Sequence, residues 1–435
     1  DPGHMSQTQP IFHPGRMAGR RSGRLARYAI WIALAAALVL LPYLFSSRLA
    51  LSTMCLMGTM IVFALSYNML LGQTGLLSFG HAVFFGLGGF VTVHLLNMAG
   101  AGGWLVPLPL FPVVGGLGGL FFGVVFGAVA TKRAGTAFAR ITLGIGELVV
   151  SSALVLRRFF GGEEGITTDR TEVAAFFGYS FGPQVQVYYL VAAWCFVSVA
   201  AMYAITRTPF GRICHAVRDN PQRTAFIGYD TSTVRFIAFS LSGLFAGIAG
   251  GLSAINFEII NGAQMGAAES GAVILMTYIG GVGNFAGPVI GAILITWLQL
   301  TLSDATKIWP LYVGLLFIGM VMFAPGGIAG LLAMQAPLLA ARRLHRVLPY
   351  YVLALVPGAV AVVGLSVLIE TSHQFSIRAA YGPDLTLYSI PFTVTSPLPW
   401  ITGIVFAAGG LWLFLRAARL ARNSYDEAVA AGRDA

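Results

Sequence analysis

The chain has 435 residues, of which 57% are hydrophobic and only 10% are charged, and its formal net charge is +10. This small number of polar side chains cannot cover the surface of a water-soluble protein of this length. The composition therefore excludes a soluble globular domain and predicts a polytopic membrane protein. The arginines cluster at the ends of apolar runs, where membrane topology and anionic lipid headgroups account for them. We therefore expect contact with membrane lipid and no binding of nucleic acid.

The amino-terminal residues 1–27 form a basic polar arm. Asp1 to His4 resembles a cleavage and cloning remnant, so we expect the native chain to begin at Met5. The apolar run after the arm is too long for a cleaved signal peptide, which places the arm on the cytoplasmic side. Its arginines are Arg16, Arg20, Arg21, Arg24 and Arg27.

Apolar runs along the chain are candidates for membrane-spanning helices, because roughly 20 apolar residues cross the hydrocarbon core of a bilayer. They lie near residues 28–46, 51–71, 78–98, 104–131, 134–156, 184–206, 236–256, 268–283, 286–302, 310–332, 350–369 and 398–418. The run at 268–283 is short enough to be re-entrant. Backbone amides in lipid need internal partners, and no alternating barrel pattern is present. The predicted fold class is therefore all-α: a polytopic helical transmembrane protein with about 10–12 membrane segments, including possible discontinuous helices.

Positive charges between the predicted spans set the topology, since cytoplasmic loops are enriched in arginine and lysine. The basic residues expected inside are Lys132, Arg133, those of the segment 207–235, Arg342, Arg343, Arg346, Arg416, Arg419 and Arg422. A minority is expected outside, namely Arg48, Arg157, Arg158 and Arg170. Both termini are therefore predicted on the cytoplasmic side.

Glycine is abundant, with 54 residues, and it concentrates at Gly72 to Gly89 and at Gly280 to Gly291. Transporters often break helices near the middle of the bilayer, where freed amide and carbonyl groups can hold a substrate. Close packing of helices through small residues is the commoner use of membrane glycine. The sequence leaves both interpretations open.

The stretch from Gly211 to Asp230 is basic and polar and lies between two long apolar runs. Asn220 followed by Pro221 predicts the N-cap and the first residue of a short helix, and Gly228 is suited to end that helix in the left-handed conformation. A compact helix on an arginine-rich loop offers a surface on which a cytoplasmic partner can act. A loop that serves only to set the topology is the alternative.

Polar and ionisable residues inside the apolar runs are the candidates for a substrate pathway. Arg140 and Glu147 are seven positions apart, so they lie on nearly the same face of a helix. Glu147 is the stronger candidate, for contact with a substrate ammonium group or for a gate, whereas Arg140 can reach toward the inner surface. The other candidates, which can also serve only as interhelical hydrogen-bond partners, are Asn68, Gln73, Thr74, Ser78, His81 and Asn284.

The sequence predicts no energy source of its own. Its two lysines, Lys132 and Lys307, do not lie in a G-x-x-x-x-G-K-[ST] string, so this nucleotide-binding loop is absent. Ionisable residues in the apolar runs are too few for a proton relay, and no convergent acid, base or metal-binding set is present. The widely separated Cys55, Cys195 and Cys214 predict neither a disulfide nor a metal site. We predict no catalytic residue and no metal; energy comes from a partner, or transport is passive.

Four strings carry a pattern in sequence order. They begin at Gly72 (GQTGLLSFGHAVFFG), Arg207 (RTPFGR), Ala238 (AFSLSGLFAGIAGG) and Gly280 (GGVGNFAGPVIGA), with shorter matches at 137–143, 161–165 and 325–330. Together they resemble the permease subunits of branched-chain amino acid ABC importers, over about residues 30 to 335. The resemblance implies a permease domain at 28–335 whose segment 207–235 couples it to an ATPase. The implied coupling residues are Gly211, Arg212, Arg218, Asp219, Arg223 and Gly228.

The same resemblance implies an assembly and a function. The partners would be a sister permease subunit, two cytoplasmic ATP-binding subunits and a periplasmic substrate-binding protein, which can dock on outer acidic residues such as Glu163 and Glu164. ATP and magnesium would bind the partner subunits, so no cofactor is expected in this chain. The function implied is import of branched-chain or related amino acids across the bacterial inner membrane by alternating access. Urea, short amides and other small carboxylates stay open as cargo, and a stand-alone channel for small polar solutes is the alternative of another class.

The resemblance ends before the last part of the chain. Residues 336–435 are predicted to add two further spans, an outer loop and a cytoplasmic tail, and their role is not indicated by the sequence.

Overall fold

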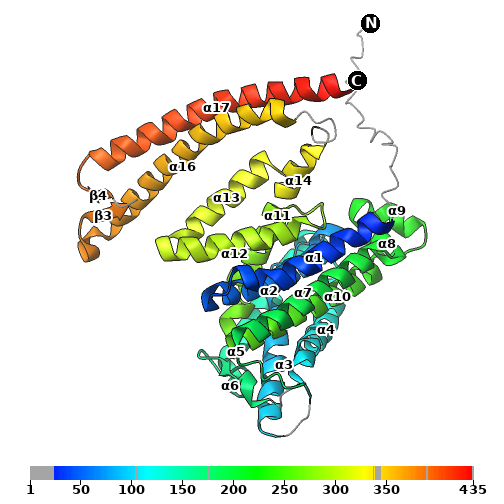
Figure 1. Cartoon of the computed structure of the whole chain (residues 1–435). Helices are drawn as coiled ribbons and strands as arrows, with labels where there is room; N and C mark the ends of the chain where they lie inside the picture. The colour runs from blue at the N-terminus through cyan, green and yellow to red at the C-terminus, as the bar shows by residue number, and fades with distance from the viewer. Residues whose placement is uncertain are drawn as a thin grey trace. The chain divides into compact units, whose positions relative to one another are not determined.

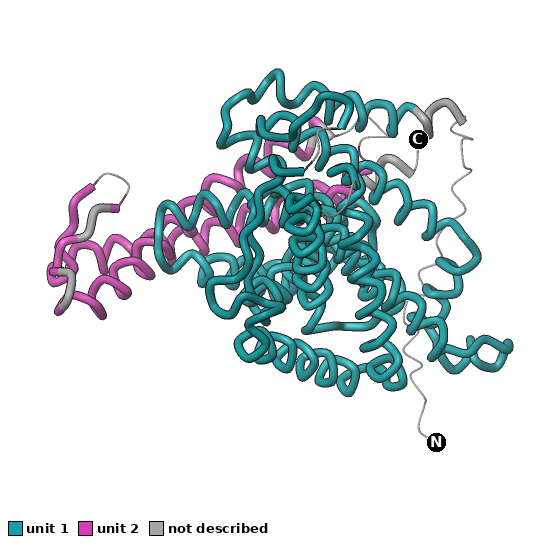
Figure 2. Tube along the Cα trace, turned by 90° about the horizontal axis from the view of Figure 1, so that it is seen from below, with its two compact units in different colours: residues 1–330 teal, residues 331–435 magenta. Residues whose placement is uncertain are grey.

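The computed structural model describes residues 24–102, 106–173, 176–336, 338, 344–387 and 390–433. Its described part is almost entirely helical, with two short two-stranded sheets (Figure 1). The chain divides into two compact units, residues 1–330 and residues 331–435 (Figure 2). The sequence-based boundary at residues 335 and 336 stays a prediction. Predictions made for residues 1–23, Arg342 and Arg343, and for the side chains of Arg24, Arg27 and Arg346, lie outside the described residues.

The first unit contains most of the helices. In chain order its elements are α1 (Arg24–Leu44), α2 (Arg48–Thr74), α3 (Ala82–Gly100), η1 (Leu108–Leu110), α4 (Phe111–Ala130), α5 (Thr136–Val155), α6 (Arg157–Phe160), β1 (Ile166–Thr167), η2 (Arg170–Glu172), α7 (Gln184–Arg207), α8 (Pro209–Asp219), α9 (Pro221–Phe226), α10 (Thr231–Phe257), β2 (Ile259–Ile260), η3 (Gly262–Met265), α11 (Ala267–Gly280), α12 (Gly287–Ala305) and α13 (Trp309–Phe323). Helix α14 (Gly327–Met334) begins in the first unit and ends in the second.

Nine helices of the described chain are long and apolar enough to cross a membrane, or up to ten if the bent pair α13 and α14 forms one span. Helices α1 and α11 carry shorter apolar stretches, and α11 lies at the run that the sequence predicts to be short. Within the described residues, most of each predicted apolar run lies on a helix or, near residues 310–332, on the bent pair. The prediction of an all-α, polytopic membrane fold is therefore confirmed.

Glycines determine how closely α10 approaches α4. Gly115, Gly119 and Gly123 recur at every fourth position of α4 and face α10. A Cβ atom on Gly119 would collide with the carbonyl oxygen of Gly243 in α10, and one on Gly247 would collide with that of Gly115. Small residues at this spacing let helix backbones pack closely in a membrane. This packing leaves α10 at the centre of the unit, with 78% of its apolar window buried.

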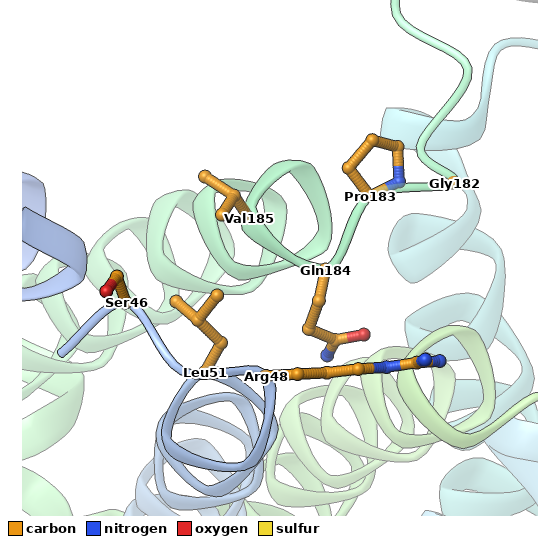
Figure 3. Close-up of a pocket in the computed structure, with 7 residues that line it drawn as sticks. All are labelled: Ser46, Arg48, Leu51, Gly182, Pro183, Gln184 and Val185. Carbon is orange, nitrogen blue, oxygen red and sulfur yellow. The ribbon is translucent and has the colours of Figure 1, made fainter.

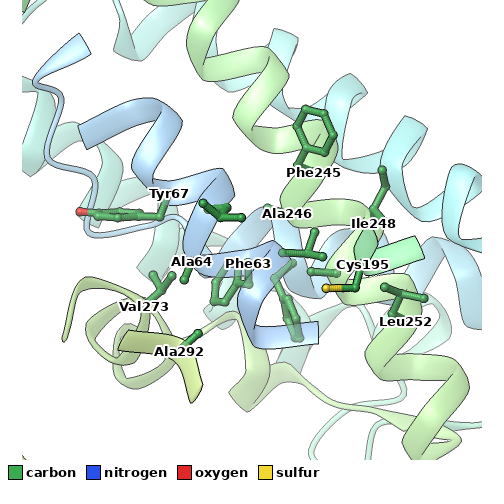
Figure 4. Packing of buried hydrophobic residues seen from close by; sticks show 14 of the residues in the cluster. Phe63, Ala64, Tyr67, Cys195, Phe245, Ala246, Ile248, Leu252, Val273 and Ala292 are labelled. Carbon is green, nitrogen blue, oxygen red and sulfur yellow. The ribbon is translucent and has the colours of Figure 1, made fainter. Parts of the chain in front are cut away.

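The apolar core surrounds the second half of α2. Figure 4 shows Phe63, Ala64 and Tyr67 of α2 packed among side chains of α7, α10, α11 and α12. The three cysteines are buried and free; two of them, Cys55 and Cys195, belong to this core. They act as small apolar side chains, as the sequence predicts.

The first glycine cluster interrupts the helices over only part of its length. The break occupies residues 75–81 between α2 and α3, and Gly75 opens it with a left-handed φ of 72°. Gly86, Gly88 and Gly89 lie inside α3, where a Cβ atom on Gly88 would collide with α10. The first part of this cluster therefore breaks the helix, and the second part allows close packing of α3 against its neighbours.

The second glycine cluster also combines a break with close packing. The break occupies residues 281–286 between α11 and α12, and Gly281 has a φ of 118°. Gly280 and Gly291 let the two helices approach, since a Cβ atom on Gly291 would collide with the carbonyl oxygen of Met276. A side chain at either position would separate α11 from α12.

One arginine holds together the end of the first unit at which α10 finishes. Arg170, whose side chain is only 7% exposed, lies 3.5 Å from the carboxylate of Glu258. Its guanidinium donates to four backbone carbonyl oxygens, those of Phe181, Gly182, Ile255 and Asn256. The adjacent strands β1 and β2 pair in antiparallel register. The connection between α6 and α7 is thereby fixed to the end of α10.

The second unit is a long antiparallel hairpin of α16 (Leu344–Tyr381) and α17 (Leu398–Arg433), connected through strands β3 (Asp384–Leu387) and β4 (Ile390–Thr393). Small residues again set the packing, because a Cβ atom on Gly364 of α16 would collide with the backbone of α17 at Ala407. Helix α17 continues into the predicted cytoplasmic tail as far as Arg433, where the described residues end. The predicted pair of additional spans is thus one helical hairpin.

Candidate functional site

The basic segment between α7 and α10 folds into two short helices. The second, α9, is the predicted one: the Asn220 side chain accepts from the amide of Arg223 at 2.9 Å, Pro221 is its first residue, and Gly228 follows with a φ of 96°. The N-cap and the left-handed glycine are therefore confirmed. The first helix, α8, was not predicted and begins directly after α7, where the Thr208 hydroxyl accepts from the amide of residue 211 at 3.3 Å.

The segment also ends earlier than its predicted boundary at residue 235. Asp230 caps α10, which begins at Thr231; its carboxylate accepts from the amides of Ser232 and Thr233. A hydrogen bond from the Thr233 hydroxyl, together with these amide hydrogen bonds, holds the pKa of the exposed Asp230 carboxyl below its usual value. The loop available to a partner is consequently residues 208–230.

Helix α8 lies against α10 with a small apolar face. Cys214 and Val217 of α8 pack on Val234 and Ala238 of α10, and all four are buried. Gly211 allows the sharp entry into α8, because a Cβ atom there would meet the carbonyl oxygen of Thr206 at 2.6 Å. The predicted coupling residue Gly211 therefore has a steric role at the turn.

Arg218 is the one charged residue of α8 that turns inward. Its guanidinium donates to the carbonyl oxygen of Gly72, in the last turn of α2, where carbonyls lack intrahelical partners. Its Cγ lies so close to Gly75 that a Cβ atom there would approach it to 2.9 Å. The same guanidinium lies 3.1 Å from Asp219, whose side chain is 67% exposed. Arg218 therefore connects α8 to the start of the first helix break.

The opposite face of α8 and α9 points away from the helices. Arg212 and Arg223 are exposed there. Phe226 is 92% exposed and Ile227 is 67% exposed, although both are large and apolar. Exposed apolar side chains among unpaired arginines are typical of a surface that another protein covers. Of the predicted coupling residues, Arg212, Asp219 and Arg223 thus face outward, whereas Arg218 does not.

A polar pocket of about 380 Å³ lies beside α8. It brings together three of the predicted pathway residues, Asn68, Gln73 and Asn284, from the end of α2 and the second helix break. The remaining lining residues are Gly72, Tyr203, Thr206, Arg207, His215, Val282, Gly283 and Phe285. The end of α2, the second helix break and the coupling segment therefore meet at one cavity.

Arg207 and His215 both line this pocket. The Arg207 guanidinium donates to the Tyr203 hydroxyl and lies 5.0 Å from the centre of its ring. Burial lowers the pKa of His215 below its ordinary value of 6.5, and the neighbouring charge of Arg218 lowers it further. The surroundings therefore favour the neutral form of the His215 imidazole.

The first helix break is held by hydrogen bonds from side chains. The Tyr67 hydroxyl donates to the carbonyl oxygen of Ser78 at 3.1 Å, and the Ser66 hydroxyl lies 3.0 Å from Nε2 of His81. Two amides that the break frees, of residues 79 and 82, donate to the hydroxyls of Thr142 in α5 and Ser270 in α11. Three different helices therefore support the break.

The predicted pathway residues around this break are enclosed. Asn68, Gln73, Thr74, Ser78 and His81 are each at most 5% exposed. Oδ1 of Asn68, Oγ of Ser78 and Nδ1 of His81 are buried without a hydrogen-bond partner within the part of the chain that the structure describes. Unpaired buried polar atoms cost free energy in a static core, so their retention is typical of a site that rearranges or binds.

Arg140 and Glu147 are placed differently from the other candidates. Both are exposed on the same face of α5, as their spacing predicts, together with Leu143 and Leu148. Neither forms a hydrogen bond or an ion pair within the described residues. Unpaired charged side chains on an apolar helix are costly in lipid, so this face requires protein or water against it.

Some residues of the site were not predicted. Tyr203, Thr206 and His215 line the pocket, and Thr142 and Ser270 support the break. The basic sequence at 207–212 could have indicated Arg207, whereas the hydroxyl partners give no signal in sequence because they come from helices far along the chain.

Comparison with known proteins agrees with this geometry. Residues 49–325 match the family model described as the permease component of the branched-chain amino acid transport system. The chain is 27% identical over 298 residues to the high-affinity branched-chain amino acid transport system permease protein LivM of Escherichia coli (strain K12), covering 64% of this chain and 68% of that protein. It is 30% identical over 133 residues to the autoinducer 2 import system permease protein LsrC of Yersinia pestis (strain Pestoides F), covering 29% of this chain and 38% of that protein. No solved structure matches.

The family match covers the helices that form both breaks and the coupling segment, and it ends before the second unit. Proteins of this family are membrane subunits of ABC-type transporters, which work with ATPase and binding-protein partners; they are not enzymes. The apolar helices fit this role, since they make the chain a multi-pass membrane protein. The chain therefore belongs to the permease family of branched-chain amino acid transport systems.

Proposed function

We propose that the chain is the membrane permease subunit of a bacterial inner-membrane importer for branched-chain or related amino acids, driven through α8 and α9 by a cytoplasmic ATPase. The observation that carries the proposal is the contact between Arg218 and Gly72. It joins the segment on which a motor would act to the helix break that leads to the buried polar residues.

The outward face of α8 and α9 is the proposed seat for the ATPase. It combines exposed arginines with the apolar Phe226 and Ile227, which suits a partner surface that is acidic and partly apolar. When the ATPase moves this face, Arg218 transmits the displacement to the end of α2. The break at residues 75–81 then changes the exposure of Asn68, Ser78 and His81. Alternating access would follow from this local rearrangement.

A sister permease subunit is the proposed cover for the charged face of α5. Arg140 and Glu147 point outward without partners, so water in a shared pathway or polar groups of a second subunit would stabilise them. A zwitterionic amino acid matches this pair, because a carboxylate and an ammonium group can approach the guanidinium and the carboxylate in turn. The cargo class rests on this match and on the branched-chain relatives.

Assembly tests the proposal directly. We expect the tagged chain, expressed with its partner subunits, to copurify with an ATPase. The Phe226→Asp and Arg212→Glu variants should lose at least tenfold of the bound ATPase, and the Arg158→Glu variant, which changes an exposed charge at the other end of the spans, should lose none. If the wild type and all three variants recover the same amount of ATPase, α8 and α9 are not the docking face.

A further inference from the structure

A second pocket, of about 370 Å³, lies at the end of the first unit that is opposite to α8 and α9. It forms between the connection from α1 to α2 and the start of α7, and it is lined by Ser46, Arg48, Leu51, Gly182, Pro183, Gln184 and Val185. Figure 3 shows the Arg48 side chain extended alongside Gln184. We propose that this pocket binds the phosphate of a phospholipid headgroup.

The charge in the pocket is uncompensated. Its lining residues include one cation, Arg48, and no acidic residue. Within the described residues, the Arg48 guanidinium has no hydrogen bond and no ion pair. A guanidinium offers five N–H donors in a planar fork that matches phosphate and carboxylate oxygens. The lining of the pocket therefore suits an anion.

Backbone amides add to this donor surface. Arg48 is the first residue of α2 and Gln184 the first residue of α7, so two helices of more than 20 residues begin at the same pocket. The N-cap of α7 is Pro183, whose side chain makes no capping hydrogen bond, which leaves the first amides of that helix without a side-chain acceptor. The positive ends of two helix dipoles therefore reinforce the charge of Arg48.

A third observation is an unused donor behind the pocket. Nε2 of Gln184 donates to Oδ1 of Asn256 at 2.8 Å, which fixes the orientation of the Gln184 amide. Asn256 is only 7% exposed, and its Nδ2 has no partner within the described chain. The side chains here offer more donors than acceptors.

The rim of the pocket indicates a lipid and not a soluble anion. Tyr43, Leu44 and Leu49 are 78%, 75% and 80% exposed, and Phe45 beside them is 55% exposed. These residues join the ends of α1 and α2, where spans meet the headgroup region and where aromatic side chains are favoured. A bound phospholipid would place its phosphate at Arg48 and its acyl chains along this apolar rim.

A lipid at this position would stabilise the attachment of α1. The hydroxyls of Tyr188 and Tyr189 in α7 donate to carbonyl oxygens of α1, at Leu38 and Val39. The pocket is lined by residues of α2 and α7 and by Ser46 of the connection that follows α1. We therefore expect the bound headgroup to bridge α2, α7 and this connection.

The test uses the full chain with its partner subunits, purified in mild detergent and examined by native mass spectrometry while phosphatidylglycerol is added. We expect one tightly held lipid that is lost at least tenfold more readily from the Arg48→Gln variant. The Arg157→Gln variant is the matched control, since it removes an exposed charge at the same end of the spans but outside the pocket. The Arg48→Lys variant, which keeps the charge without the fork, should lie between wild type and Arg48→Gln, and it replaces Arg48→Gln if that variant does not insert.

Three results would overturn the proposal. The first is equal lipid retention by wild type and the Arg48 variants. The second is displacement of the lipid by inorganic phosphate or glycerol phosphate at equal concentration, which would make the pocket a site for free phosphate. The third is unchanged lipid binding together with loss of a docked extracytoplasmic binding protein in the Arg48→Gln variant, which would make it a protein-docking site.

Discussion

The two ends of the first unit are held in different ways. At one end, Arg170 is buried and donates to four carbonyl oxygens besides its ion pair with Glu258. At the other end, Arg218 is 35% exposed and reaches one carbonyl oxygen, that of Gly72, while the rest of α8 and α9 is held by helix caps and a small apolar cluster. The first end is held by many polar contacts of one buried arginine, whereas the second is held by one hydrogen bond of a partly exposed arginine, by caps and by a small apolar cluster. Motion driven from outside would therefore start at the second end.

The largest effect is expected where the first end is broken. Replacing Arg170 with Met leaves the four carbonyl oxygens without their side-chain donor and removes the ion pair of Glu258, whose side chain is 35% exposed. We expect the free energy of unfolding to fall by about 3–5 kcal/mol. Thermal unfolding of the purified protein measures it, with Arg158→Met as the control because Arg158 is exposed at the same end. Similar losses in both variants would mean that Arg170 does not fix this end.

A smaller loss of stability but a large loss of coupling is expected at the second end. Arg218→Gln removes a charged hydrogen bond from a partly exposed site, which should cost about 1–2 kcal/mol. Assembly with the ATPase should persist, because Arg218 faces α2. Uptake per ATP hydrolysed, measured in proteoliposomes, should fall at least fivefold. Arg212→Gln should show the opposite pattern, with weaker assembly and normal uptake per ATP for the complexes that form.

The caps of the coupling segment should contribute less. Asn220→Ala removes the acceptor for the amide of Arg223, and loss of such a cap costs about 1 kcal/mol. A loss of about 1 kcal/mol raises the population of the locally opened state roughly fivefold, so the amides of α9 should exchange hydrogen about five times faster. The exchange rate of the Arg170 amide should stay unchanged. Gln222→Ala, an exposed change in the same helix, is the control. An unaltered exchange rate in Asn220→Ala would show that α9 does not depend on its cap.

The smallest effect concerns pH. The pKa of His215 is lower in the folded protein than its ordinary value of 6.5, so the unfolded chain binds the proton more readily. The folded state should therefore lose stability as pH falls from about 6.5 toward the folded pKa, and should gain nothing further above 6.5. Unfolding temperatures between pH 5 and pH 8 measure this, and His215→Asn should flatten the dependence. If the unfolding temperature of His215→Asn depends on pH as strongly as that of the wild type, another group causes the dependence.

The sequence alone predicted those features of the fold that depend on residues close together in the chain. Apolar run length predicted the helices, and Asn220 with Gly228 predicted α9, since caps and left-handed turns depend on neighbouring residues. The approach of Gly72 to Arg218 was not predictable, because it joins residues 146 positions apart. The same limit applies to Thr142 and Ser270, which are ordinary helix residues until tertiary packing brings them to freed amides. Arg48 was predicted only as a minority charge of the topology, and its pocket depends on the start of α7.

The most direct test of the central claim is uptake of labelled leucine by proteoliposomes that contain the chain with its sister, ATPase and binding-protein partners. The account predicts accumulation that requires hydrolysable ATP, is absent with the chain alone, and falls at least fivefold in Arg218→Gln although the complex still assembles and hydrolyses ATP. Equal uptake without nucleotide, or with the chain alone, would contradict a permease that is driven through α8 and α9.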